Sequence, residues 1–432
     1  MEFSPSRPDH PAPVVTRSPE FPPAGLFPPQ VRDSFPALAE AGEVYLDSAA
    51  TTQKPRSVID TVRNYHASAT ANAARGTYPW ATALTQQIAA VRARTARFIG
   101  AGDPGEIVFT AGATAALNAV ALSWGLTALR DGDEILYSPA DHAANVLPWY
   151  LLRDTLARFG RRIELVPYRM TPSGRADSAD IADKIGPRTR LLTVSHLHHV
   201  FGGLTALDDL RDRIPDRVLV CYDCSQSGGH LPVDVAALGA DFAVFAGHKM
   251  FAAPGTGVLY CHRRVHPDLR PFLPGGATDA RLTTDGFETG RMPGLLEGGT
   301  PNIPGILALG TALEALDSYG MPAVAAHNRI LTRRLLDGLR DVPGVDFLPG
   351  PGHGAGDTGY GIVSFTLDGI SAADLGFVLA EYGFLVRTGT HCVPAAADAE
   401  TGSVRVSTHI YTGLADIDHF TDRVRALAEE FV

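Results

Sequence analysis

Cysteine is scarce in this sequence, with four among 432 residues, too few for the disulfide framework of a small secreted protein. No apolar run approaches ~18 residues, so we expect no membrane-spanning helix. Basic residues are outnumbered, 37 against 47 acidic ones, which gives a net charge of -10. That balance argues against a surface built for nucleic acid or anionic membranes. A reducing cytoplasm is the expected location.

The length and the 45% hydrophobic content suit one or two globular domains with a large core. Proline and serine are frequent in the first thirty or so residues, which lack the charged-then-apolar layout of a signal peptide. We interpret that stretch as a flexible or draped arm. We predict three parts: the arm over 1–42, a large domain over 43–303 and a small domain over 304–432.

Runs typical of strands alternate with helix-like runs from about residue 86, which predicts βαβ units around a mostly parallel sheet. The expected strands are 106–110, 134–138, 162–167, 191–196, 218–223, 241–245 and 257–261, with helices at 114–129 and 145–159. After residue 303 the pattern is that of a smaller α+β domain. Its expected elements are helices at 305–319, 323–339 and 372–382, strands at 361–367, 385–387 and 403–407, and a helix from residue 414.

Lys249 is the most informative residue. It follows the buried-strand pattern of Phe242–Phe245, and Gly247 breaks that strand just before it. Open α/β sheets bind ligands at the carboxyl ends of their strands. A partly buried lysine there is suited to form a Schiff base with a carbonyl cofactor. Asp223 ends another predicted buried strand. Pyridoxal phosphate needs that pair, a lysine for its aldehyde and an acid for its pyridine nitrogen. The alternative is an ordinary solvated lysine.

Four further residues near strand ends give weaker signals. Thr114 follows Gly112 at a strand-to-helix turn, where free amides suit a phosphate, although an ordinary helix cap is the alternative. His142 offers an imidazole that can stack on a flat ring and shuttle protons, or else it is a capping or surface histidine. Gln226 is placed to hydrogen-bond the cofactor's phenolic oxygen and His248 its phosphate. For either residue alone, a loop role is the simpler interpretation.

Cys392 lies in a glycine-containing loop after a predicted strand and is flanked by Arg387 and His391. Cationic neighbours lower a thiol's pKa and make it nucleophilic, so we expect Cys392 to react with alkylating agents faster than the other three cysteines. A buried structural cysteine is the alternative. Arg405, on a later strand, can hold a substrate carboxylate with two hydrogen bonds, the alternative being a surface salt bridge.

Cys221 and Cys224 form a CxxC pair. On a predicted strand, residues i and i+3 face opposite sides, which separates the two thiols. We therefore expect two buried cysteines rather than a redox or metal-binding pair. No metal site is predicted elsewhere in the chain.

In their order along the chain, these motifs resemble those of class V, fold-type I enzymes that use pyridoxal phosphate. The likeness is greatest to the cysteine desulfurase and selenocysteine lyase branch, and it covers about residues 43–432. Besides the residues above, it rests on Tyr45–Ala50, on the stretch DHAANVLPW from Asp141, on Glu297–Asn302 and on Val386–Cys392. The resemblance implies an α/β fold-type I transferase, with a mostly parallel seven-stranded sheet in the large domain and a small C-terminal α+β domain.

The resemblance also implies roles for single residues. Lys249 would carry the cofactor, His142 would stack on its ring, Asp223 would pair with the pyridine nitrogen and Gln226 would reach the phenolic oxygen. Cys392 would accept sulfur. The remaining implied positions are Ala113, Thr114, His248 and His199 around the cofactor, Thr300 at the phosphate of the neighbouring subunit of a homodimer, and Arg405, Arg387, Ala49 and Tyr78 around the substrate.

In the implied reaction, Lys249 removes the α-proton of L-cysteine while the cofactor acts as an electron sink. The Cys392 thiolate attacks the substrate sulfur, alanine leaves and a persulfide remains on the enzyme. The persulfide then passes to an acceptor protein or to a small thiol. The implied partners are thus an amino-acid substrate, a sulfur acceptor and a second copy of the chain.

Several positions depart from the pattern of the family. His199 replaces an asparagine, Ala246 a serine, Ala115 an acidic residue and Tyr78 a histidine. These changes leave open a substrate other than free cysteine. The alternative is therefore a related class V enzyme, such as a C–S lyase, an epimerase or an aminotransferase, in a specialised biosynthetic pathway. A non-catalytic protein that kept the fold is a third possibility, which the intact set of candidate residues disfavours.

Overall fold

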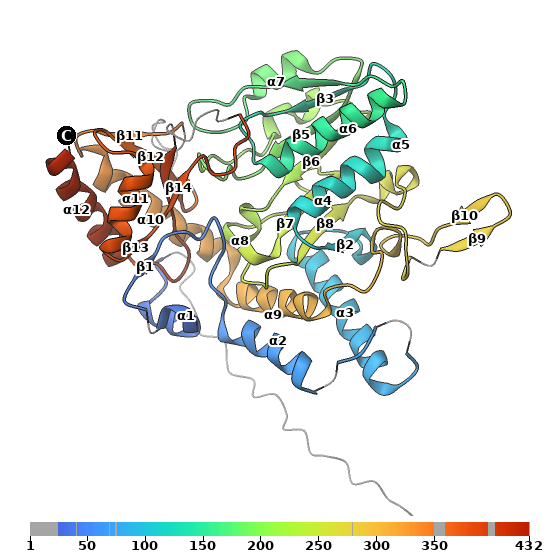
Figure 1. Cartoon of the computed structure of the whole chain (residues 1–432), viewed down its shortest axis with the longest axis horizontal. Coiled ribbons are helices and arrows are strands. Elements are labelled where there is room, and N and C mark those ends of the chain that lie inside the picture. The colour runs from blue at the N-terminus through green and yellow to red at the C-terminus, as the bar shows by residue number, and fades with distance from the viewer. Residues whose placement is uncertain are drawn as a thin grey trace, which may run out of the picture.

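The computed structural model describes residues 25–39, 41–68, 70–73, 76–278, 280–349, 359–395 and 402–431. Figure 1 shows a large body around a central sheet and a smaller body formed mainly by the C-terminal part of the chain. Among the described residues, none of the helices combines the length and the apolarity that a membrane span requires.

The central sheet has seven strands within the described part of the chain. Their order is β2 (Ile107–Thr110), β8 (Gly257–Cys261), β7 (Phe242–Ala246), β6 (Leu219–Asp223), β5 (Thr189–Ser195), β3 (Glu134–Tyr137) and β4 (Glu164–Pro167). In this described sheet β8 runs opposite to the other six strands, which all share one direction. The central strands are continuous apolar runs because both faces are covered; every residue of β7 is buried.

Helices cover both faces of the sheet and give it two separate cores. One face packs against α2 (Arg56–Ser68), α3 (Pro79–Phe98) and α9 (Ile303–Tyr319), and the other against α4 (Ala113–Ala119) and α6 (Leu147–Arg158). Side chains alternate along a strand, so Cys221 and Cys224 enter different cores. Both are buried free thiols, which confirms the prediction of two separate cysteines.

The smaller body is built on an antiparallel sheet of four described strands. Their order is β11 (Val345–Phe347), β12 (Ile362–Leu367), β15 (Ser403–Ser407) and β14 (Arg387–Gly389). Its core is shared with α10 (Met321–Arg340), α11 (Ala372–Glu381) and α12 (Leu414–Phe431). This body has the predicted mixture of helices and strands.

The segment that begins at β1 ties the two bodies together. The short strand β1 (Val44–Tyr45) pairs in parallel with β13 (Phe384–Leu385), and Asp47 bridges to Ser407 of β15. Farther along, the Ala49 N–H donates to the Ser407 hydroxyl of β15, and the Ala49 carbonyl accepts from Gln226 of the large body. The remaining elements are α1 (Pro36–Ala39), α5 (Leu126–Ala128), α7 (Ser178–Lys184), α8 (Ser227–His230) and the projecting hairpin β9 (Arg281–Thr283) and β10 (Gly286–Glu288) (Figure 1).

The α/β fold class and the mostly parallel seven-stranded sheet are confirmed. The predicted boundaries 42/43 and 303/304 remain predictions. Residues 1–24 and 40 of the predicted arm lie outside the described residues. Residues 25–39 of the arm are draped on the large body, because Phe27, Val31 and Phe35 are buried in one of the cores.

The helix predicted over 114–129 is not a single α-helix. α4 ends at Ala119, and a π-helical stretch, Val120–Gly125, separates it from α5. Within that stretch, the Ser123 carbonyl accepts a hydrogen bond from the backbone N–H of Arg270. This tertiary contact competes with the helical hydrogen bonds, and a sequence pattern does not reveal it.

Candidate active site

A cavity of about 730 Å³ opens at the carboxyl edge of the central sheet. Ser195, Asp223 and Ala246, the last residues of β5, β6 and β7, all line it. Arg387 of β14 and Arg405 of β15 line it from the smaller sheet. The cavity therefore lies between the two sheets, at the edge where open α/β sheets bind ligands.

Most of the residues predicted from the sequence meet in this cavity. They are Ala49, Ala113, Thr114, His142, His199, Asp223, Gln226, His248, Lys249, Arg387, Cys392 and Arg405. Thr300 and Tyr78 lie elsewhere. Thr300 lines a second cavity of about 430 Å³, and Tyr78 is an exposed residue just before α3. Within one chain these two do not join the group, so their assignments remain predictions.

Lys249 follows β7 in a single 3-10 turn that Gly247 begins. Burial lowers the pKa of its amine from 10.5 to about 8, and the positive charge of Arg405 acts in the same direction. An amine with that pKa is partly neutral at neutral pH, which is the state that attacks a carbonyl or accepts a proton. The negative charge of Asp223 opposes the shift.

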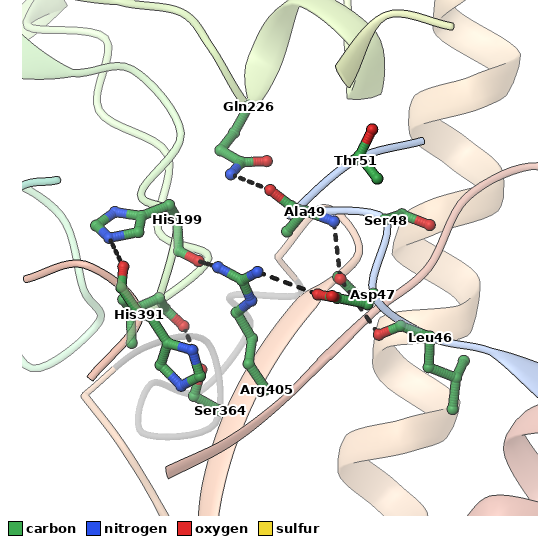
Figure 2. Close-up of polar contacts among 12 residues, drawn as sticks. Leu46, Asp47, Ser48, Ala49, Thr51, His199, Gln226, Ser364, His391 and Arg405 are labelled. Atoms are coloured by element: carbon green, nitrogen blue, oxygen red, sulfur yellow. Dashed lines mark hydrogen bonds and ion pairs between the residues drawn. The ribbon is translucent and has the colours of Figure 1, made fainter. Parts of the chain in front are cut away.

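Asp223 is the last residue of β6 and Gln226 follows three residues later, and both line the cavity. The Asp223 Oδ1 accepts a hydrogen bond of 2.9 Å from the backbone N–H of Ser225. Gln226 donates from its Nε2 to the Ala49 carbonyl at 2.9 Å, as Figure 2 shows. The buried Gln226 Oε1 has no hydrogen-bond partner among the described residues. A buried polar atom of this kind calls for a further polar group in the cavity.

The turn between β2 and α4 supplies backbone N–H groups to the cavity. Gly112 occupies the N-cap position with φ 148°, in a region that favours glycine. Because glycine has no capping side chain, the first amides of α4, at Ala113 and Thr114, are left for a ligand. Thr114 thus lies in the first turn of α4, and the alternative of an ordinary helix cap does not hold for it. Gly257 of β8 packs so closely that a Cβ there would lie 2.6 Å from the Gly112 Cα.

His142 and His199 lie beside each other in the cavity, with ring centroids 5.1 Å apart. The His142 Nδ1 accepts a hydrogen bond from the backbone N–H of Ala144, so this histidine both caps a turn and lines the site. Burial lowers the pKa of both imidazoles. His248 has its pKa lowered to about 4, chiefly by burial. In the described chain no group of His, Cys, Asp or Glu side chains is arranged to hold a metal ion.

Cys392 is the exposed cysteine of the cavity. Its negative form is attracted by Lys249 and Arg405. The prediction that His391 is a cationic neighbour is wrong, because burial lowers the pKa of that imidazole to about 3 and leaves it neutral. Arg387 does share the cavity with the thiol. The positive charges near Cys392 are therefore those of the lysine and the two arginines.

Arg405 is held between two loops, as Figure 2 shows. One terminal nitrogen donates to the His199 carbonyl at 3.0 Å and the other lies 3.3 Å from Asp47 Oδ1. The buried Nε of Arg405 has no partner in the described part of the chain. Burial raises the pKa of Asp47, and the charges of Arg405, Arg387 and Lys249 oppose that rise.

Asp47 is the site residue that the sequence analysis missed. It lies within the quoted motif Tyr45–Ala50, yet nothing in the local sequence links it to Arg405, 358 positions away. The signal in the sequence was the Asp47 carboxylate directly before the small residues Ser48–Ala50. Its partner becomes visible only when β1 has paired with the smaller body.

Comparison with known proteins agrees with this geometry. Residues 44–420 match the Aminotransferase class-V family. A cysteine desulfurase from Klebsiella pneumoniae is 36% identical over 411 residues, covering 92% of this chain and 98% of that protein. A solved cysteine desulfurase from Escherichia coli, in an S-sulfonic acid form, is 32% identical with a TM-score of 0.83, covering 94% of this chain and 100% of that chain. A C-DES mutant with glycine covalently linked to its PLP cofactor has a TM-score of 0.77 at 24% identity, covering 91% and 98% of the two chains; it shares the fold.

Proposed function

Because this chain belongs to the class-V aminotransferase family, we propose that Cys392 is the thiol through which it works as a cysteine desulfurase. The chain is an enzyme of the fold-type I class, and its cofactor is pyridoxal phosphate. One observation carries the proposal: the exposed Cys392 thiol lies in the same cavity as Lys249, Asp223 and Arg405. A thiol, a lysine, an acid and an arginine are the groups that desulfuration of an amino acid needs.

The residues in the cavity fit pyridoxal phosphate. Lys249 would hold its aldehyde, Asp223 would pair with its ring nitrogen and His142 would lie against the ring. The partnerless Oε1 and the second amide hydrogen of Gln226 are polar groups left for it. When bound, this cofactor supplies an electron sink for the carbon next to the substrate carboxylate.

Two further parts of the cavity have separate tasks. The first amides of α4, at Ala113 and Thr114, together with the neutral His248, would bind the phosphate. Arg405 would bind the substrate carboxylate through its partnerless Nε and its remaining N–H groups. Arg387 adds a second positive charge on the same side. These contacts would hold the cofactor at its phosphate and the substrate at its carboxylate.

Lys249 and Cys392 would carry out the chemistry on the bound substrate. Lys249, with its pKa near 8, takes the α-proton and returns a proton to the product. The Cys392 thiolate attacks the substrate sulfur, so an S–S bond forms as the C–S bond breaks. The products are alanine and a persulfide on Cys392. This transfer is balanced without any outside oxidant.

A second function is favoured by the departures from the family pattern. His199, Ala115 and Ala246 all line the cavity, so each change alters the surface that meets cofactor or substrate. A related class V enzyme that acts on another amino acid, by C–S lysis, epimerisation or amino transfer, would retain Lys249 and Asp223. It would not depend on Cys392.

The test is an assay of the purified enzyme with L-cysteine under reductant, measuring alanine and sulfide. We expect both products in equal amounts, and a loss of roughly three orders of magnitude or more in Cys392→Ser, as for other removed nucleophiles. The cofactor absorbance of the variant should match that of the wild type. Unchanged alanine formation in Cys392→Ser would favour the second function instead.

The partners follow from the same proposal. We propose that the chain forms a homodimer in which Thr300 reaches the site of the other copy, since Thr300 lines a separate open cavity. We propose that the persulfide passes to an acceptor protein or a small thiol, because Cys392 is exposed. A reducing cytoplasm would keep this thiol reduced.

A further inference from the structure

The backbone at the candidate nucleophile is strained. His391 and Cys392 are consecutive non-glycine residues with φ 52° and 65°, both in the left-handed region. Side chains with a Cβ avoid this region, and residues remain there only when their surroundings hold them. The conformation directs the exposed Cys392 into the cavity that contains Lys249. Something must therefore hold these two residues.

Three hydrogen bonds hold the strained pair, each 2.9 Å long. The His199 Nε2 bonds to the His391 carbonyl, the backbone N–H of Ala143 donates to the Cys392 carbonyl, and the His391 Nε2 bonds to the Ser403 hydroxyl. A carbonyl only accepts hydrogen bonds, so the His199 Nε2 carries the proton and donates. Of the three bonds, this is the one made by a side chain that departs from the family pattern.

The turn that carries His199 is itself fixed. The His199 carbonyl accepts from Arg405, and the next carbonyl, at Val200, accepts from the hydroxyl of Ser364 at 2.8 Å. His199 is buried, and its ring contacts those of His142 and His198, with centroids 5.1 and 4.9 Å away. A ring enclosed in this way can act as a rigid support for a neighbouring loop.

We propose that the His199 side chain is a clamp that holds Cys392 in its strained conformation and so positions the thiol for reaction. His199 is thus a positioning residue that acts through the His391 carbonyl. Its part in sulfur transfer rests on the proposed function, whereas its hold on the loop does not. His199 contacts both parts of the proposed site: its backbone carbonyl accepts from Arg405, and its ring bonds to the loop that carries Cys392.

The length of the side chain makes the proposal testable. In histidine the donor Nε2 is three bonds from Cβ, whereas the amide nitrogen of asparagine is two bonds away and does not reach the His391 carbonyl from the same Cβ. Glutamine places its amide nitrogen three bonds from Cβ. His199→Asn should therefore release the loop, and His199→Gln should restore it.

The experiment measures amide hydrogen exchange over residues 387–395 and at Ala143 in the cofactor-loaded enzyme. We expect exchange about fivefold faster in His199→Asn, which corresponds to about 1 kcal/mol, the usual contribution of a hydrogen bond. His199→Gln should approach the wild-type rate, and His66→Asn on the exposed face of α2 should equal it. Should His199→Asn fail to fold, His199→Ala provides the same comparison without a misplaced amide.

Kinetics then separates the clamp from a general structural role. In His199→Asn, kcat for alanine formation should fall at least tenfold while KM for L-cysteine changes less than twofold, because Arg405 is held by the backbone carbonyl at position 199. Wild-type exchange rates over 387–395 in His199→Asn would overturn the proposal even if activity fell. If exchange is faster in His199→Asn but the wild-type enzyme forms no persulfide, the role of His199 in holding the loop is supported and the proposed function is overturned.

Discussion

At the scale of single residues, burial and neighbouring charges set the chemistry of the site. Lys249 has an amine pKa of about 8 because burial and Arg405 disfavour its charge, while Asp223 and Asp47 partly restore it. Asp47 also pairs with Arg405, which is otherwise held by a backbone carbonyl. The protonation of the lysine therefore depends on a carboxylate that contributes no atom to the reaction.

Replacing Asp47 by asparagine should lower the pKa of Lys249 further, because a negative charge that favours the ammonium form is lost. Since the neutral amine is the reactive form, the acidic limb of the kcat/KM profile should move to lower pH. Asp368→Asn, on an exposed turn, is the matched control. If the acidic limb of the kcat/KM profile of Asp47→Asn stays in place or moves to higher pH, the role given to Asp47 is contradicted.

At the scale of elements, the carboxyl ends of β5, β6 and β7 and the first turn of α4 place the reactive groups. The close approach of β8 to that turn depends on Gly257, since a Cβ there would lie 2.6 Å from the Gly112 Cα and 2.8 Å from the Phe245 carbonyl oxygen. The phosphate-binding amides are thus fixed by strand packing. They do not depend on a capping side chain.

Gly257→Ala should push the turn away from β8 and weaken cofactor binding by roughly tenfold or more, with a loss of about 1–3 kcal/mol in the free energy of unfolding. Equilibrium dialysis followed by absorption spectroscopy measures the first effect, and urea unfolding the second. Gly275→Ala is the control, because none of the described atoms lies within 4 Å of a Cβ at that position. Wild-type cofactor affinity in Gly257→Ala would show that the turn tolerates the added methyl group.

The sequence predicted the elements that are continuous in the chain. Buried parallel strands such as β6 and β7 are apolar runs, and motif residues at their ends, such as Asp223 and Lys249, could be assigned to one edge of the sheet. Contacts between distant segments could not be predicted. The pairing of Asp47 with Arg405 spans 358 positions, and the neutral state of His391 depends on burial that only the folded chain creates.

At the scale of the whole molecule, the site is shared between two sheets. The central sheet contributes Lys249 and Asp223, and the smaller sheet and its loop contribute Arg405 and Cys392. The two bodies are joined by the segment that follows β1 and by His327 of α10, which accepts a hydrogen bond from the Phe27 N–H of the segment draped on the large body. The other ring nitrogen of His327 bonds to the Thr412 carbonyl within the smaller body. The distance between lysine and thiol therefore depends on how firmly these bodies are joined.

Acid should weaken this joint. Burial lowers the pKa of His327 to about 4, below its ordinary 6.5, so the stability it contributes is present above pH 6.5 and is lost as pH falls toward 4. The loss for this side chain is up to about 3 kcal/mol. His327→Gln, which keeps an acceptor and a donor but does not titrate, should flatten the unfolding free energy between pH 6.5 and 5.

Urea unfolding followed by tryptophan fluorescence at several pH values makes that comparison. His66→Gln, on the exposed face of α2, should keep the wild-type profile. If the unfolding free energy of His327→Gln depends on pH as strongly as that of the wild type, the acid sensitivity arises elsewhere. The other buried histidines His196, His198 and His230 would then be the source, because their pKa values are also lowered to about 4.

The central claim is that Cys392 receives the sulfur of the substrate. Its most direct test is mass spectrometry of the enzyme after a single turnover with L-cysteine, without reductant and after proteolysis. We expect the mass of one added sulfur atom on the peptide that contains Cys392, and unmodified Cys221, Cys224 and Cys261, which are buried. Alanine formed in the same reaction with Cys392 unmodified would contradict the account.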